Sequence, residues 1–224
     1  MPTRKLYDDE LKELSAALIR MGTAAIEAVT RSMQALKTFD KKLAKEIIED
    51  DANINAMERD IETMCLKLIL KQQPVATDLR KISTAIKMIT DIERIGDAAS
   101  DIAEISQYHD SVAFPDLQDE VLKMAESAKE MVAAAIDAYV KGDLDLAKKT
   151  MIKDDIVDDY FLKIRHELGS KIYKDTRDME TVIDYLMIVK YLERIGDHAV
   201  NICEWVHFYI TGIHINEELP DSHI

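Results

Sequence analysis

The sequence is short of the residues that end helices and of the residues that form disulfide or zinc sites. Its 224 residues include six Gly, four Pro and two Cys, while 47% are apolar. So few Gly and Pro leave little of the turn punctuation that strands and hairpins need. Cys65 and Cys203 do not have a zinc-type spacing, and we expect them to be buried free thiols in a reducing compartment. The composition predicts an all-α protein with a sizeable core.

The sequence also lacks long hydrophobic runs and an excess of positive charge. No apolar stretch approaches the ~18 residues that suggest a membrane-spanning helix, and the N-terminal stretch MPTRKLYDDE has no hydrophobic signal region. The formal net charge is −14. A field of that sign repels nucleic acid phosphates and anionic membrane surfaces, and it attracts cations. We therefore expect a cytosolic protein that binds no nucleic acid and does not insert into a membrane.

What the sequence does contain is an internal repeat. The stretch DIERIGDAASDIAEI at 91–105 returns as YLERIGDHAVNICEW at 191–205, with eight of fifteen positions identical. Upstream of these stretches, IIEDDANIN at 47–55 aligns with MIKDDIVDD at 151–159, an offset of 104 residues. Each half is longer than the usual solenoid unit. The repeat therefore predicts a duplicated small domain.

Three long helices are expected in each half. Asp40 and Asp143 can cap the helices that follow them, Gly142 can end a helix, and Pro115 can open one. Long helices bury their apolar stripes by packing lengthwise, so we expect two antiparallel three-helix bundles in tandem. These domains are residues 1–112 and 113–211, followed by a C-terminal tail at 212–224. The expected helices are 6–38, 41–71, 75–108, 117–140, 143–170 and 176–211.

Carboxylates and amides gather on one face of the repeated helix, opposite its apolar stripe, and a second such face lies on the helix before it. Like charges four residues apart repel by roughly 0.2–0.5 kcal/mol per exposed pair, so their repetition suggests a use. If the two helices pack side by side, their oxygen ligands meet along a seam and suit Mg, Ca, Mn or Fe. The candidate ligands are Asp51, Asn55, Glu93, Asp97, Asp101, Asp155, Asp159, Glu193, Asp197 and Asn201.

A glycine stands inside each repeated helix, at Gly96 and Gly196. Glycine costs ~1 kcal/mol relative to alanine in a helix interior, so its repetition indicates that something approaches the backbone closely. We favour a neighbouring helix over a ligand. Arg94 and Arg194 beside these glycines can brace a carboxylate or take a phosphate.

The residues alone leave three interpretations open. A charged stripe is most often the solvated face of an amphipathic helix, and the chain would then be a bare scaffold. A carboxylate-bridged metalloenzyme of the ferritin type needs two Glu-x-x-His pairs inside a four-helix core, and only Glu204 and His207 have that spacing. The third interpretation is a non-enzymatic protein that binds metal on its acidic seams.

The motifs IERIGD and LERIGD, with DDANIN, DDIVDD and KQQPVATDLR, resemble the PhoU family of phosphate-system regulators. The resemblance covers nearly the whole chain. It implies two similar three-helix bundles, six long helices in all, and often a homodimer. It also implies a cytosolic, non-enzymatic negative regulator of phosphate uptake and of the phosphate-starvation response. The implied partners are the ATPase subunit of the phosphate ABC transporter and a membrane sensor histidine kinase.

The resemblance further implies bound iron or zinc, in clusters of one or more ions, on motifs of the form Glu/Asp-x-x-x-Asp. One of the four expected pairs departs from that form, because Asp51 is followed by Asn55, which is a poorer ligand. Asp101 can compensate, since the second half has Asn201 at that place. The three pairs that fit are Glu93 with Asp97, Asp155 with Asp159, and Glu193 with Asp197.

Overall fold

The structure is a computed structural model that describes residues 2–72, 74–111, 114–174 and 179–215. These residues form helices and no strand, which confirms the all-α prediction. None of the described helices is long and apolar enough to cross a membrane. The predicted tail lies outside the described residues from residue 216 onward. The helices are α1 (Pro2–Thr38), α2 (Lys41–Gln72), α3 (Ala76–Ser106), α4 (Pro115–Lys141), α5 (Leu144–Ile152), α6 (Asp154–Lys174) and α7 (Met179–Thr211).

The same turn follows the first helix of each half. Gly142 has a φ of 65° after α4, and Phe39 takes a φ of 57° after α1 although it is not a glycine. In both turns the next residue is an aspartate that caps the following helix. Asp40 Oδ1 accepts from the N–H of Leu43 at 3.0 Å, and Asp143 Oδ1 accepts from the N–H of Leu146 at 2.9 Å. Both predicted caps are confirmed.

The helix expected over residues 143–170 is divided into α5 and α6 at Lys153. The N–H of Lys153 donates to the carbonyl of Thr150, and the N–H of Ile156 donates to the carbonyl of Lys153, both at 3.0 Å. Both hydrogen bonds join residues three apart, as in a 3₁₀-helix, and they tighten the backbone for one turn. Asp154 and Asp155 then stand in the first turn of α6, where carboxylates interact favourably with the helix dipole.

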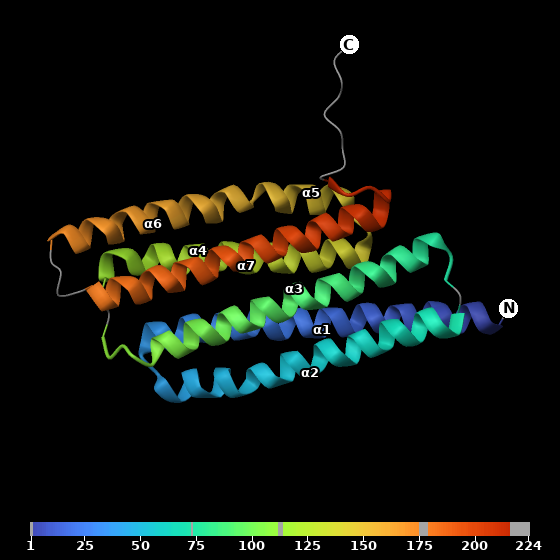
Figure 1. Ribbon diagram of the computed structural model, residues 1–224, viewed down its shortest axis with the longest axis horizontal. Helices are drawn as coiled ribbons and strands as arrows, with labels where there is room; N and C mark the ends of the chain where they lie inside the picture. The colour runs from blue at the N-terminus through green and yellow to red at the C-terminus, as the bar shows by residue number, and fades with distance from the viewer. Residues whose placement is uncertain (1, 73, 112–113, 175–178, 216–224) are drawn as a thin grey trace, which may run out of the picture.

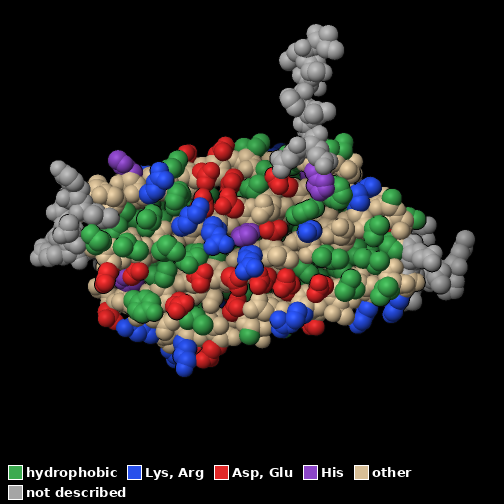
Figure 2. All heavy atoms as spheres, in the orientation of Figure 1, with side chains coloured by type: hydrophobic (Ala, Val, Ile, Leu, Met, Phe, Trp, Pro, Cys, Tyr) green, Lys and Arg blue, Asp and Glu red, His purple; other side chains and the backbone are tan. Residues whose placement is uncertain are grey.

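Each half forms an antiparallel three-helix bundle, as predicted, with α5 and α6 together acting as one helix of the second half. In Figure 1, α3 and α7 lie side by side at the centre, α2 and α6 flank them, and α1 and α4 lie behind. Every helix of the second half runs opposite to its counterpart in the first. We call the solvent-facing side of the α2–α3–α7–α6 layer the front face. Figure 2 shows Asp and Glu side chains gathered across its middle.

Polar contacts between α3 and α7 reveal a local two-fold axis. Asn201 Nδ2 donates to Asp91 Oδ1 at 3.2 Å, and the Tyr191 hydroxyl hydrogen-bonds to Asp101. Positions 91 and 191 are equivalent in the repeat, as are positions 101 and 201. Each contact is therefore the counterpart of the other, as at an interface between two identical subunits.

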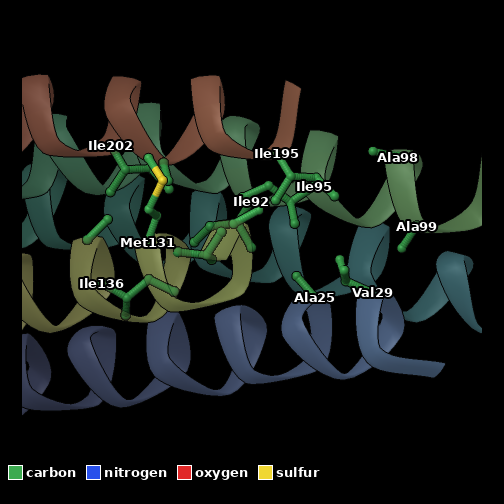
Figure 3. Packing of buried hydrophobic residues seen from close by; sticks show 14 of the residues in the cluster. Ala25, Val29, Ile92, Ile95, Ala98, Ala99, Met131, Ile136, Ile195 and Ile202 are labelled. Atoms are coloured by element: carbon green, nitrogen blue, oxygen red, sulfur yellow. The ribbon is translucent and has the colours of Figure 1, made fainter. Parts of the chain in front are cut away.

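The two halves share one hydrophobic core. A single cluster of buried side chains includes residues from both halves, and α3 and α7 make the most extensive contact between any two helices. Ile92 and Ile95 of α3 lie close to Ile195 of α7 (Figure 3). The predicted boundary near residue 112 thus divides the sequence into two repeats. It does not divide the hydrophobic core, which is continuous between them.

Candidate functional site

The first acidic seam lies between α2 and α3. It consists of Asp51, Asn55 and Glu58 on α2 and Glu93 and Asp97 on α3. Burial and the nearby Asp97 carboxylate raise the pKa of Asp51, while Asn55 Nδ2 donates to Asp51 Oδ2 at 2.9 Å. Burial raises the pKa of Glu93 as well, and Asp97, Glu58 and Asp51 add to that increase. The predicted meeting of the two acidic faces therefore occurs in this half.

Arg94 partly neutralises the first seam. Its Nη1 lies 2.9 Å from Asp97 Oδ2, and its Nε lies 3.4 Å from Glu93 Oε2. The guanidinium thus braces two carboxylates of its own helix, which was one of its two expected roles. Since half of its side chain is exposed, these ion pairs add little stability.

The second acidic seam lies between α6 and α7, and consists of Asp154, Asp158, Glu193 and Asp197. Burial, followed by the carboxylates of Asp158, Asp197 and Glu193, raises the pKa of Asp154 to about 6. Lys190 forms an ion pair with Glu193. The counterpart of Asn55 here is Asp158, so this seam has no amide. Each seam has four carboxylates and one basic residue paired with them, Arg94 in the first and Lys190 in the second.

The repeat glycines allow the helices of each seam to approach closely. A Cβ at position 96 would lie 2.9 Å from Ile54 Cδ1 and 3.5 Å from Asp51 Oδ1, and one at position 196 would lie 2.9 Å from Asp154 Oδ1. A distance of 2.9 Å is shorter than real Cβ atoms show to a neighbouring heavy atom. The contact with a neighbouring helix, which we favoured from the sequence, therefore explains both Gly96 and Gly196.

These glycine contacts also place Asp154, and not Asp155, opposite Asp51 in the repeat. The offset at this helix is 103 residues, the same as between Phe39 and Gly142, whereas the sequence alignment took it as 104. Asp155 and Asp159 are exposed, and neither faces Gly196. Of the ten predicted ligands, the structure thus brings Asp51, Asn55, Glu93 and Asp97 together in one seam, and Glu193 and Asp197 in the other.

Asp101 and Asn201 serve a different contact. Both belong to the two-fold related hydrogen bonds between α3 and α7, with Tyr191 and Asp91 as their partners. Asp101 remains near enough to Asp51 for its charge to raise the pKa of that residue. His198 adds a contact to the same interface, because its Nδ1 lies 2.9 Å from Asp91 Oδ1.

Buried oxygens in both seams are suited to a cation. Asp51 Oδ1 and Asp154 Oδ1 are buried and have no hydrogen-bond partner among the described residues, and the same holds for Asn55 Oδ1. Buried polar atoms are nearly always paired with protein, water or an ion. Carboxylate and amide oxygens are the ligands that hard cations prefer. In their present orientations, however, no three His, Cys, Asp or Glu side chains of the described residues are grouped closely enough to hold a metal.

A known protein family has the same three-helix unit, and it matches this chain twice. A family model described as the PhoU domain matches residues 18–106 and matches again over residues 121–206. The chain belongs to the PhoU family. The two matches correspond to the two three-helix bundles, and each includes one acidic seam and one ERIGD motif.

Relatives of this PhoU-family chain are similar over nearly their whole length. A phosphate-specific transport system accessory protein PhoU homolog of Clostridium acetobutylicum is 38% identical over 94% of this chain and 96% of its own. The PhoU protein of Escherichia coli K12, which has the same accessory-protein name, is 31% identical over 92% of this chain and 86% of its own. The crystal structure of PhoU from Pseudomonas aeruginosa is 34% identical, with a TM-score of 0.87 over 92% of this chain and 100% of that one.

The names of these PhoU relatives describe accessory proteins and not enzymes, as expected for this chain. The single Glu-x-x-His spacing also contributes nothing to either seam. His207 is buried, and its Nδ1 lies 3.1 Å from the carbonyl oxygen of Ile213.

Sequence reasoning missed Asp154 and Asp158 as members of the second seam, and Tyr191, Asp91 and His198 as contacts between the halves. A signal for the first two was present. Aligning the helix caps Asp40 and Asp143 gives an offset of 103 residues, which pairs Asp51 with Asp154. The contacts between halves left no such signal, because they depend on how the repeats pack.

Proposed function

We propose that this chain is a cytosolic, non-enzymatic negative regulator of phosphate uptake and of the phosphate-starvation response. The observation that carries the proposal is the likeness to phosphate-specific transport system accessory proteins over both repeats, at 38% identity across 94% of the chain in one case. A related crystal structure from Streptococcus pneumoniae, titled a phosphate transport system regulatory protein, has a TM-score of 0.87 and 27% identity. The proposed role is thus that of these accessory proteins.

The proposed partners are the ATPase subunit of the phosphate ABC transporter and a membrane sensor histidine kinase, and the chain forms a homodimer. A helical molecule with charged and apolar side chains exposed on its surface suits an adaptor, since such side chains can contact other proteins. In phosphate-rich conditions the adaptor holds the transporter and the kinase in their low-activity states.

Deletion of the gene tests this role. In phosphate-rich medium the deletion strain should express alkaline phosphatase and take up phosphate at levels that the parent reaches only in starvation. A wild-type copy supplied on a plasmid should restore repression. Phosphate-responsive output that is the same in the deletion strain and its parent would refute the regulatory role.

We also propose that the acidic seams bind iron or zinc, or a hard cation such as Mg²⁺, Mn²⁺ or Ca²⁺, singly or in clusters. The buried, unpaired oxygens of Asp51 and Asp154 favour this second role, because a cation in each seam would satisfy the oxygen there. A bound cation would supply positive charge that offsets the repulsion within each seam. The second seam should be the stronger site, since Asp158 there supplies a carboxylate where the first seam has the amide of Asn55.

Elemental analysis of purified protein tests the metal proposal. Wild-type protein loaded with each candidate cation should retain metal after desalting, and the double substitution Glu193→Ala with Asp197→Ala should remove it from the second seam. The matched control is Asp145→Ala, an exposed carboxylate of α5 outside both seams. Metal-free wild-type protein under every loading condition would refute metal binding and leave the adaptor role standing.

A further inference from the structure

The front face presents the same features twice. On α3 an exposed stripe includes Leu79, Lys87 and Arg94, and the equivalent positions of α7 hold the exposed Met179, Met187 and Arg194. The stripe of α3 faces solvent because α2 and α7 flank that helix and α1 lies behind it. The corresponding stripe of α7 is exposed for the same reason, with α6 and α3 beside it and α4 behind.

Apolar side chains stand at both ends of this face. Leu79 is 43% exposed and its equivalent Met179 is 45% exposed. Val75, at 67%, extends the first apolar end, and Ile183, at 49%, extends the second. In Figure 2 hydrophobic side chains gather towards the two ends of the face, with acidic and basic side chains between them. Exposed apolar groups bordered by charged ones are typical of protein-binding surfaces.

The local two-fold axis relates these two ends. It passes between α3 and α7, where the contacts Asp91–Asn201 and Tyr191–Asp101 are counterparts. Rotation by half a turn therefore exchanges the apolar ends, and it exchanges the two acidic seams as well. A partner with its own two-fold axis can make equivalent contacts with both halves at once.

We propose that the front face docks one two-fold symmetric protein dimer, and that each of the dimer's identical subunits contacts one half of the chain. Each subunit places apolar side chains on one apolar end of the face. Its basic side chains lie next to the solvent-exposed carboxylates of one seam. The inference rests on the proposed function, since the dimer is then the pair of ATPase subunits of the transporter.

Charge argues against a second copy of this chain as the occupant. The protein has 43 acidic and 29 basic residues. Two copies joined front to front would bring four acidic seams together, and like charges across an interface disfavour the pairing. The basic Arg94 does not offset this, because it already pairs with Glu93 and Asp97. The proposed homodimer therefore uses another surface.

Stoichiometry and matched substitutions test the inference. Native mass spectrometry of the purified full-length chain with the purified ATPase subunit should show one chain for every two subunits. In a binding titration, Leu79→Glu and Met179→Glu should each weaken binding about tenfold, and their combination about a hundredfold, because distant sites contribute additively. The control Ile19→Glu alters a side chain of α1 that is 45% exposed, and it should leave binding unchanged.

The outcomes separate this inference from the proposed function. One chain per single ATPase subunit, or a loss of affinity with only one of the two equivalent substitutions, would overturn the symmetric docking and leave the regulatory role intact. Failure to form any complex would overturn both the ATPase partnership and the symmetric docking, whereas the gene deletion would still test regulation independently.

Discussion

Substituting Gly96 by alanine tests whether close helix packing determines the glycine of the ERIGD motif. Alanine in place of glycine within a helix gains ~1 kcal/mol of stability from backbone propensity alone. At position 96, however, the new Cβ would lie 2.9 Å from Ile54 Cδ1 and 3.3 Å from Ile54 Cγ2. Ile54 is only 4% exposed and packs in the shared core, so relief of the contact requires a shift of a buried side chain. Overpacking of this kind costs roughly 1–3 kcal/mol.

The net effect of Gly96→Ala should therefore lie between no change and a loss of about 2 kcal/mol. Gly169 is the matched control, because it lies within α6 and a Cβ there would meet no atom within 4 Å. Gly169→Ala should realise the full gain of ~1 kcal/mol, which raises Tm by about 2–4 °C in a protein of this size.

Thermal unfolding followed by circular dichroism measures both variants. Adding Ile54→Val to Gly96→Ala removes the Cδ1 atom nearest the new methyl group, so the pair should destabilise less than the sum of the two single changes. A rise in Tm for Gly96→Ala as large as that for Gly169→Ala would refute the close-packing explanation.

Three further predictions follow from the seams and the cysteines. Burial and neighbouring carboxylates raise the pKa of Asp154 to about 6 from 3.8, so its contribution to stability is present below pH ~4 and lost as pH rises through about 6. In urea unfolding, Asp154→Asn should thus be more stable than wild type at pH 8 but not at pH 4; indistinguishable curves at both pH values would contradict this. Mn²⁺ at pH 7.5 should raise the Tm of wild type more than that of Asp154→Asn, and equal shifts would count against a cation at that oxygen. Burial raises the pKa of Cys65 and Cys203 to about 12. A chromogenic disulfide reagent should therefore react with neither thiol until the protein unfolds. Rapid reaction of the native protein would show that one of them is accessible.

The sequence predicted the helices because their ends have strong local signals. Asp40, Asp143, Gly142 and Pro115 all act as expected from their residue types. The break at Lys153 has a weaker signal, since no Gly or Pro stands there and only the pair Asp154 and Asp155, which favours the first turn of a helix, marks it. Such a break depends on how α5 and α6 pack against α4 and α7.

The sequence predicted an acidic seam in each half. It predicted the correct residues of both helices only in the first seam. Two adjacent aspartates, Asp154 and Asp155, permit two alignments with the first half, and the sequence alignment chose Asp155. One residue corresponds to about 100° of rotation on a helix, which is enough to carry a carboxylate from the seam to solvent. The local two-fold axis was beyond prediction, because tandem repeats can stack by translation as readily as they pair by rotation.

The segment of residues 107–114 joins the two bundles into a single chain. Separate bundles held by the same contacts would come apart on dilution, whereas a covalent tether keeps each at a constant effective concentration near the other. The distance between the two seams is consequently the same in a cell that holds few copies as in one that holds many.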